Sequence, residues 1–280
     1  MEEAITSAMA LAPLVDGHTH IDQYGPDEQS GLLMRAREAG VGLIIAAGTT
    51  LASCSAVLRL AESEPLVRAG VGLHPQDLAD WVDDATVTRL RHLARRPRTV
   101  EWSETGLDYQ PSSPRWDLQQ DAFRRQARLA RDLGLPMVVH SREADADMLR
   151  LLREEGVREV GGAWHYFQGD RALAEQVLEL GFHISLAKPL LRSPEMQAVV
   201  ATLPLERIVL ETDSYPQPFK KNRMAWTEPW QLPQVAAKVA ELQGVAIECV
   251  AEATTANYLR MLRGRVPAGE LSTSPHGADR

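Results

Sequence analysis

The feature that most constrains the fold is a repeated alternation between short apolar runs and segments with helical spacing. The apolar runs have the length of buried strands, and each is followed by a helix-forming segment. They lie at 11–15, 41–47, 67–73, 99–104, 135–139, 160–164, 182–186 and 208–211. Alternation of this kind favours parallel strands joined by right-handed helical crossovers. Eight such units in roughly 250 residues predict a single-domain α/β fold, the (β/α)8 or TIM barrel.

The composition narrows the class of protein. The 280 residues carry a formal net charge of −8, which argues against a broad nucleic-acid-coating surface but leaves room for a local basic pocket. The two cysteines form no disulfide or metal-binding pattern, the first residues lack a basic signal-peptide start, and no apolar run approaches about 20 residues. We therefore expect a cytoplasmic protein without membrane association. The barrel is predicted to span 1–263, and the Gly-, Pro- and Ser-rich tail at 264–280 is predicted to be disordered.

A histidine pair follows the first apolar run. In Asp16-Gly17-His18-Thr19-His20, a strand would direct both imidazoles to the same face, because side chains alternate with a period of two. Two imidazoles so placed can bind one divalent metal ion. The alternative is a surface turn with two solvated histidines, and the presence of further ligands at other strand ends decides between them.

Such ligands follow other predicted strands. Imidazole and carboxylate side chains stand at or just beyond these strand ends at His18, His20, His74, Glu104, His140, His165 and Asp213. In a (β/α)8 barrel these ends meet at one mouth, where the active site lies. Two Zn, Mn, Mg or Fe ions about 3.5–4 Å apart would need roughly this many nitrogen and oxygen donors, with one carboxylate bridging.

Several motifs together resemble a known family. Asp16-Gly-His-Thr-His20, Gly72-Leu-His-Pro75, Ser103-Glu-Thr-Gly-Leu-Asp-Tyr109, His140-Ser-Arg142, His165-Tyr-Phe-Gln-Gly169 and Glu211-Thr-Asp-Ser214 occur in the order and spacing of the TatD-type metal-dependent hydrolases. These are nuclease-like members of the amidohydrolase superfamily, and the similarity covers about 14–262. The resemblance implies a dinuclear metal site, phosphoester hydrolysis and a deoxyribonuclease or 3′→5′ exonuclease activity on DNA or RNA.

Matching positions in the family assign roles to the metal-site residues. His18, His20 and Asp213 would hold one divalent ion, His140 and His165 the second, and Glu104 would bridge them. The ions would be Mg, Mn, Zn or Fe. Asp213 and Glu104 are the expected catalytic residues, with Asp213 as proton acceptor; for Asp213 the alternative is a helix N-cap. The substrate would be nucleic acid, with single-stranded ends, or a small phosphoester, and the oligomeric state stays open.

Five further residues are candidate substrate contacts, and each has a structural alternative. His74 could be a packed histidine, Arg142 a solvated ion-pair partner rather than a phosphate clamp, and Asp108 and Tyr109 could be loop structure. Glu211 could instead orient a metal ligand.

Aromatic and basic residues depart from the family pattern and leave the substrate open. Trp102, Trp164, Tyr166 and Trp226 are expected near the mouth, where they could stack bases or shape a small-molecule pocket. The basic cluster 220–223, in a loop at 215–229 over the mouth, could be a phosphate path or a solvated loop. An amide, lactone or other small-ester hydrolase is therefore an alternative function, and a non-catalytic accessory role is a further one.

Overall fold

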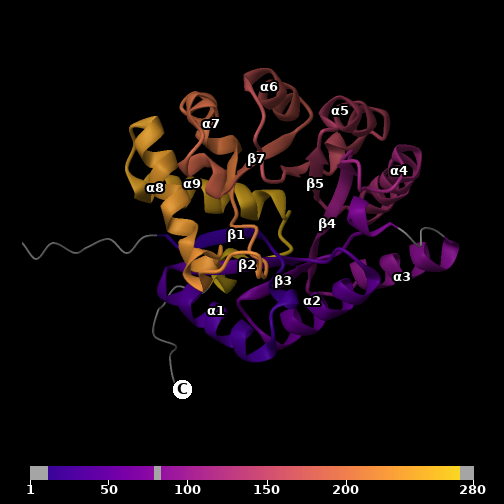
Figure 1. Ribbon diagram of the computed structural model, residues 1–280, viewed down its shortest axis with the longest axis horizontal. Helices are drawn as coiled ribbons and strands as arrows, with labels where there is room; N and C mark the ends of the chain where they lie inside the picture. Colours follow the sequence, from indigo (N-terminus) through magenta and orange to yellow (C-terminus); the bar gives the residue numbers. More distant parts are fainter. Residues whose placement is uncertain (1–11, 79–82, 272–280) are drawn as a thin grey trace, which may run out of the picture.

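The computed structural model describes residues 12–78 and 83–271, and it confirms the predicted barrel (Figure 1). The strands are β1 (Leu14–Thr19), β2 (Val41–Ala47), β3 (Val67–Gly70), β4 (Thr99–Asp108), β5 (Met137–Arg142), β6 (Gly162–Trp164), β7 (Phe182–Leu186) and β8 (Ile208–Leu210). The α-helices are α1 (Pro26–Glu38), α2 (Leu51–Ser63), α3 (Asp84–Ala94), α4 (Trp116–Leu133), α5 (Asp145–Glu154), α6 (Arg171–Glu179), α7 (Pro194–Val200), α8 (Leu232–Gln243) and α9 (Ile247–Met261).

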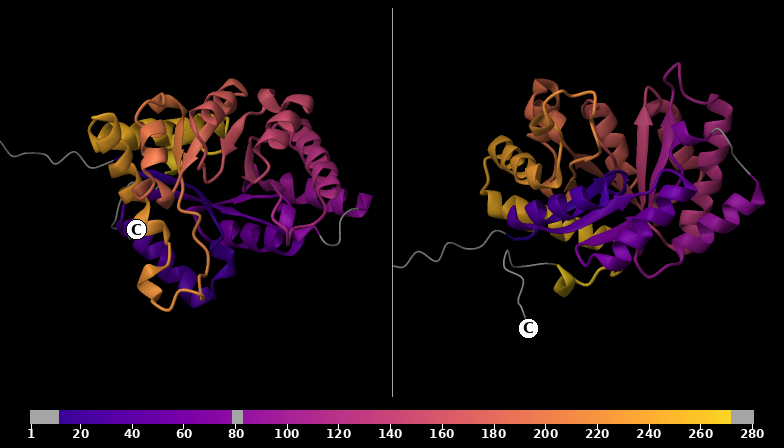
Figure 2. Two further views of the ribbon diagram at one scale, coloured as in Figure 1. Left: turned by 45° about the horizontal axis from the view of Figure 1, so that its top comes forward. Right: turned by 60° about the horizontal axis from the view of Figure 1, so that its bottom comes forward.

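The strands are parallel and pair in chain order from β1 to β8. The two outer strands meet through a parallel bridge between Thr19, at the end of β1, and Ser214, just past β8. Helices surround this sheet, as Figures 1 and 2 show. Among the described residues, no helix combines the length and the apolar character needed to cross a membrane. This contact closes the barrel and brings the carboxyl end of β8 beside that of β1, so that residues from both ends face the same mouth.

The strands are buried on both faces, as expected for a barrel inside a layer of helices. In β2, Leu43 and Ile45 belong to a cluster with inward-facing residues of other strands, whereas Ile44 and Ala46 pack in the larger cluster with the helices. This is the period of two expected of a strand. Because both faces are apolar, the sequence pattern is a continuous apolar run rather than a polar–apolar alternation.

The C-terminal segment packs against the barrel and extends the folded domain. Tyr258 and Met261 of α9 join the inward-facing cluster, and so do Leu262, Val266 and Leu271 after the helix. The prediction of a disordered tail from 264 is therefore wrong for 264–271, because the apolar side chains of Val266 and Leu271 are buried. Residues 272–280 lie outside the described residues.

Two of the aromatic residues expected near the mouth lie elsewhere. Trp102 and Trp164 are buried in the cluster between strands and helices, and the Trp102 indole N–H donates to Oε1 of Gln126 on α4 at 3.1 Å. The prediction that they could stack bases at the mouth is wrong, because their strand positions direct them outward to the helices.

Candidate metal centre

Glu104 lies buried in the barrel mouth, near the end of β4, and its two carboxylate oxygens face different histidines. The Nε2 atoms of His18 and His20 lie 3.3 and 3.4 Å from Oε2. Nδ1 of His140 and Nε2 of His165 lie 2.9 and 3.5 Å from Oε1. The two oxygens therefore face different imidazoles, an arrangement suited to a carboxylate that bridges two cations.

Asp213 joins this group from the last strand of the barrel. Its backbone N–H donates to the carbonyl of His18 at 2.9 Å, and its Oδ1 lies 3.5 Å from Nε2 of His20. Its φ of 52° is unusual for a residue with a side chain, and such conformations cluster at functional sites. Ligand atoms of His18, His165 and Asp213 lie within 4.8 Å of one another. The structure thus brings together all six side chains predicted as metal ligands.

The surroundings of His18 fit a metal ligand. Its ring is fully buried, and among the described residues its Nε2 has no hydrogen-bond partner, although buried polar atoms ordinarily have one. Burial lowers the pKa of His18. The imidazole is therefore neutral, and neutral imidazole is the form that binds divalent zinc, iron or manganese.

The two carboxylates of the centre are ionised at neutral pH. Burial raises the pKa of Glu104, but the surrounding imidazoles outweigh burial and hold this pKa well below its usual range. Burial likewise opposes ionisation of Asp213, but the hydrogen bond from His20 and the charge of His165 lower its pKa to about 2. Both groups are thus in the state that a cation requires.

Two of the predicted substrate contacts lie behind histidines instead. Oε1 of Glu211 lies 2.9 Å from Nδ1 of His165, and its Oε2 accepts a hydrogen bond from the Ser185 hydroxyl at 2.5 Å. Oδ2 of Asp108 lies 3.3 Å from Nε2 of His140. Both carboxylates are buried, so they are placed to orient a metal-binding imidazole rather than to meet substrate.

His74 also reaches the centre. Its Nε2 lies 3.6 Å from Oε1 of Glu104, and its Nδ1 accepts a hydrogen bond from the Gln76 backbone N–H at 3.2 Å. Burial lowers the pKa of His74 to about 3, so the ring is neutral and its proton is on Nε2. In this tautomer His74 donates toward the carboxylate.

A cavity of about 300 Å³ opens beside the second pair of imidazoles. It is lined by His140, Ser141, Arg142, His165, Tyr166, Gln168, Asp213 and Tyr215. Arg142 is exposed, and among the described residues its guanidinium makes no hydrogen bond or ion pair. The cavity lining therefore combines candidate metal-site residues with the unpaired guanidinium of Arg142. Gln168 and Tyr215 were not predicted as site residues; their only signal is that they follow β6 and β8 by a few positions.

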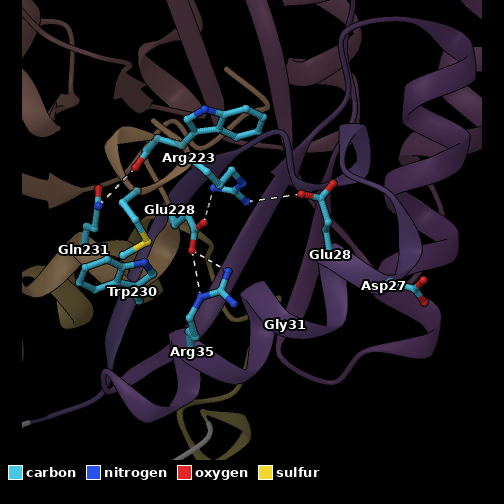
Figure 3. Close-up of a pocket in the computed structure, with 10 residues that line it drawn as sticks. Asp27, Glu28, Gly31, Arg35, Arg223, Glu228, Trp230 and Gln231 are labelled. Carbon is cyan, nitrogen blue, oxygen red and sulfur yellow. Dashed lines mark hydrogen bonds and ion pairs between the residues drawn. The ribbon is translucent and has the colours of Figure 1, made fainter. Parts of the chain in front are cut away.

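The loop at 215–229 is tied to α1, as the left view of Figure 2 shows. Nη1 of Arg223 lies 2.5 Å from Oε1 of Glu228, whose Oε2 is 2.7 Å from Nη2 of Arg35 (Figure 3). The Arg223 guanidinium also lies 4.2 Å from the ring centre of Trp226. The predicted phosphate path is wrong for Arg223, because its guanidinium already forms ion pairs with carboxylates and lies over an indole ring.

Comparisons with known proteins agree with this geometry. The family model described as TatD related DNase matches residues 15–263. The metal-dependent hydrolase YcfH of Escherichia coli is 35% identical over 257 residues, which are 89% of this chain and 95% of that protein. The 3′-5′ ssDNA/RNA exonuclease TatD of Cronobacter turicensis is 30% identical over 253 residues, 86% of this chain and 94% of that protein.

A solved structure shows the same family similarity at the level of the fold. The crystal structure of YJJV, a TatD homologue from Escherichia coli, superposes with a TM-score of 0.82 at 31% identity, and the match covers 91% of this chain and 98% of that one. The similarity thus spans the whole barrel and includes the strand ends that carry the metal-site residues. This chain belongs to the TatD family of metal-dependent hydrolases.

Proposed function

We propose that this protein hydrolyses phosphodiester bonds at the 3′ ends of single-stranded DNA or RNA, with two divalent cations held around Glu104. The observation that carries the proposal is the Glu104 carboxylate, whose two oxygens face different imidazoles. The relative from Cronobacter turicensis is named a 3′-5′ exonuclease of single-stranded DNA and RNA, which supports nucleic acid as the substrate.

In this proposal His18, His20 and Asp213 hold one cation, His140 and His165 hold the other, and Glu104 is shared. Imidazole nitrogens outnumber carboxylates in this set, which favours Zn, Fe or Mn over Mg. When bound, such a pair of cations supplies water of lowered pKa and neutralises the charge that develops on phosphoryl oxygens.

Side chains of this protein accept the proton, bind the phosphate and hold the imidazoles in position. Asp213 is ionised and next to His20, so its carboxylate can accept the proton of the attacking water. Arg142 lines the cavity with a free guanidinium and can bind two oxygens of a phosphate. Glu211 and Asp108 hold the rings of His165 and His140 in place. A cavity of about 300 Å³ accommodates a terminal nucleotide, which favours action at a strand end.

The test is cleavage of end-labelled oligonucleotides by protein loaded with each of Zn, Fe, Mn and Mg. We expect ladders that shorten from the 3′ end, and a loss of about 10²- to 10⁴-fold in rate for Asp213→Asn, the size typical of a lost general base. Glu195→Gln, which changes an exposed carboxylate on α7, is the matched control and should keep the wild-type rate. Failure to cleave any oligonucleotide with any of the four metals would overturn the proposal, and a parallel screen of amides, lactones and small esters would then identify the substrate class.

A further inference from the structure

Trp116 is an exposed aromatic residue at the mouth end of the barrel. It is the first residue of α4, which begins shortly after the end of β4, and 56% of its surface is exposed. One face of its ring stacks on Tyr109, with ring centres 4.3 Å apart and planes inclined by 13°. The stacking covers one face of the indole and leaves the rest of the ring to solvent.

Tyr109 gives this ring pair a fixed position. Its hydroxyl donates to Oδ2 of Asp147 and accepts from the side-chain amide of Gln120, both at 2.7 Å. Tyr109 is itself buried and is not among the residues that line the cavity, and its contact with substrate stays a prediction. Its ring supports Trp116. Because the pair is already ordered, a ligand that stacks on Trp116 loses little free energy in ordering it.

The backbone that carries the ring pair adjoins a residue of the cavity beside the metal centre. The Tyr109 backbone N–H donates to the carbonyl of Arg142 at 2.9 Å, across the ends of β4 and β5. Asp108, the residue before Tyr109, contacts His140. Figure 1 shows β4 beside β5, with α4 next to them. The residues that carry the ring pair and those that line the cavity are therefore neighbours along the backbone at the ends of β4 and β5.

We propose that Trp116 is a stacking platform for an unpaired nucleobase of the substrate strand, beyond the nucleotide that is being removed. This inference rests on the proposed nuclease function. An exposed indole offers a flat apolar face that any base can stack on, so the contact would be tolerant of sequence. The guanidinium of Arg142, which lines the cavity, suits a phosphate of the same strand. A base held in a duplex has no free face, so the platform selects single strands.

The experiment compares an oligonucleotide with the p-nitrophenyl ester of thymidine 5′-monophosphate, a phosphodiester that has no second base. The measured quantity is the ratio of kcat/KM for single-stranded oligodeoxythymidylate to kcat/KM for this nitrophenyl ester. For Trp116→Ala we expect this ratio to fall by roughly 5- to 150-fold, which corresponds to about 1–3 kcal/mol for one stacked base. Met34→Ala is the control, since Met34 is similarly exposed, at 54%, but lies on α1.

Two further variants distinguish base stacking on Trp116 from the effect of covering the Tyr109 ring with an apolar side chain. Trp116→Phe keeps a flat ring and should keep most of the ratio, whereas Trp116→Leu covers Tyr109 without a flat face and should lose it. Thermal denaturation of each variant checks that the fold is intact. A ratio unchanged in Trp116→Ala, or lost equally in Trp116→Phe and Trp116→Leu, would overturn the platform.

The outcome remains interpretable if the proposed function fails. If the wild-type protein cleaves no oligonucleotide, the readout becomes fluorescence anisotropy of labelled oligodeoxythymidylate with the intact protein. Binding that weakens in Trp116→Ala but not in Met34→Ala would then support the platform without nuclease activity. No binding, or equal binding in all variants, would reject it.

Discussion

The buried carboxylate of Glu211 contacts the imidazole of His165. Its replacement by Gln tests how much this carboxylate increases the affinity of His165 for a metal ion. The carboxylate accepts from the Tyr166 backbone N–H at 2.6 Å and the Ser185 hydroxyl at 2.5 Å, and lies 2.9 Å from Nδ1 of His165. Gln keeps the size of the side chain and one carbonyl oxygen, which can still accept from Tyr166. Its amide group can donate to the Ser185 hydroxyl, since a hydroxyl also accepts. The substitution therefore removes mainly the negative charge.

The loss of charge sets the expected magnitude. A carboxylate on Nδ1 fixes the tautomer that leaves Nε2 free and raises the basicity of the ring, and loss of such a partner typically weakens metal affinity 10- to 100-fold. For Glu211→Gln this corresponds to about 1.4–2.8 kcal/mol of binding free energy at the cation that His165 holds. The cation held by His18 and His20 should be affected less, because Glu211 contacts neither residue in the described structure.

Competition with a chromophoric chelator measures both affinities, and circular dichroism checks the fold. Glu195→Gln makes the same chemical change on the exposed surface of α7 and should bind both cations as the wild type does. If Glu211→Gln binds both cations with wild-type affinity while remaining folded, the argument that Glu211 prepares His165 is refuted. A loss confined to the other cation would refute the assignment of His165.

Two predictions concern the barrel beneath the centre. Burial raises the pKa of Glu101 from 4.5 to about 8, so between these pH values the folded chain keeps a proton that the unfolded chain has lost, and the free energy of unfolding falls as pH rises. Glu101→Gln still accepts the hydrogen bond from the Tyr258 hydroxyl and should remove most of this fall, measured by urea denaturation at pH 5 and pH 8; equal pH dependence in both proteins would contradict the reasoning. A Cβ at Gly17 would lie 2.2 Å from Cε2 of Tyr258, so Gly17→Ala should lower the free energy of unfolding by about 1–3 kcal/mol. An unchanged urea midpoint would show that the Tyr258 ring can move aside.

The alternation of apolar and helical segments was sufficient to predict the barrel, because strand and helix periods are local properties of a chain. It also predicted which residues meet, since parallel strands in a closed barrel bring all their carboxyl ends to one mouth. His18, Glu104 and Asp213 are separated by long stretches of sequence, yet strand ends alone placed them together. Metal-site residues were predictable for this reason.

Only the tertiary structure decided what each side chain beyond a strand end faces. The carboxylates of Asp108 and Glu211 contact the imidazoles of His140 and His165, which come from other strand ends. Trp102 faces the helices, although its strand ends at the active site. Trp116 was inconspicuous in the sequence, where its position at the start of a helix says nothing about Tyr109. The orientation of Trp102 follows from its position in the strand, whereas the contacts of Asp108, Glu211 and Trp116 depend on residues from other segments that no local pattern identifies.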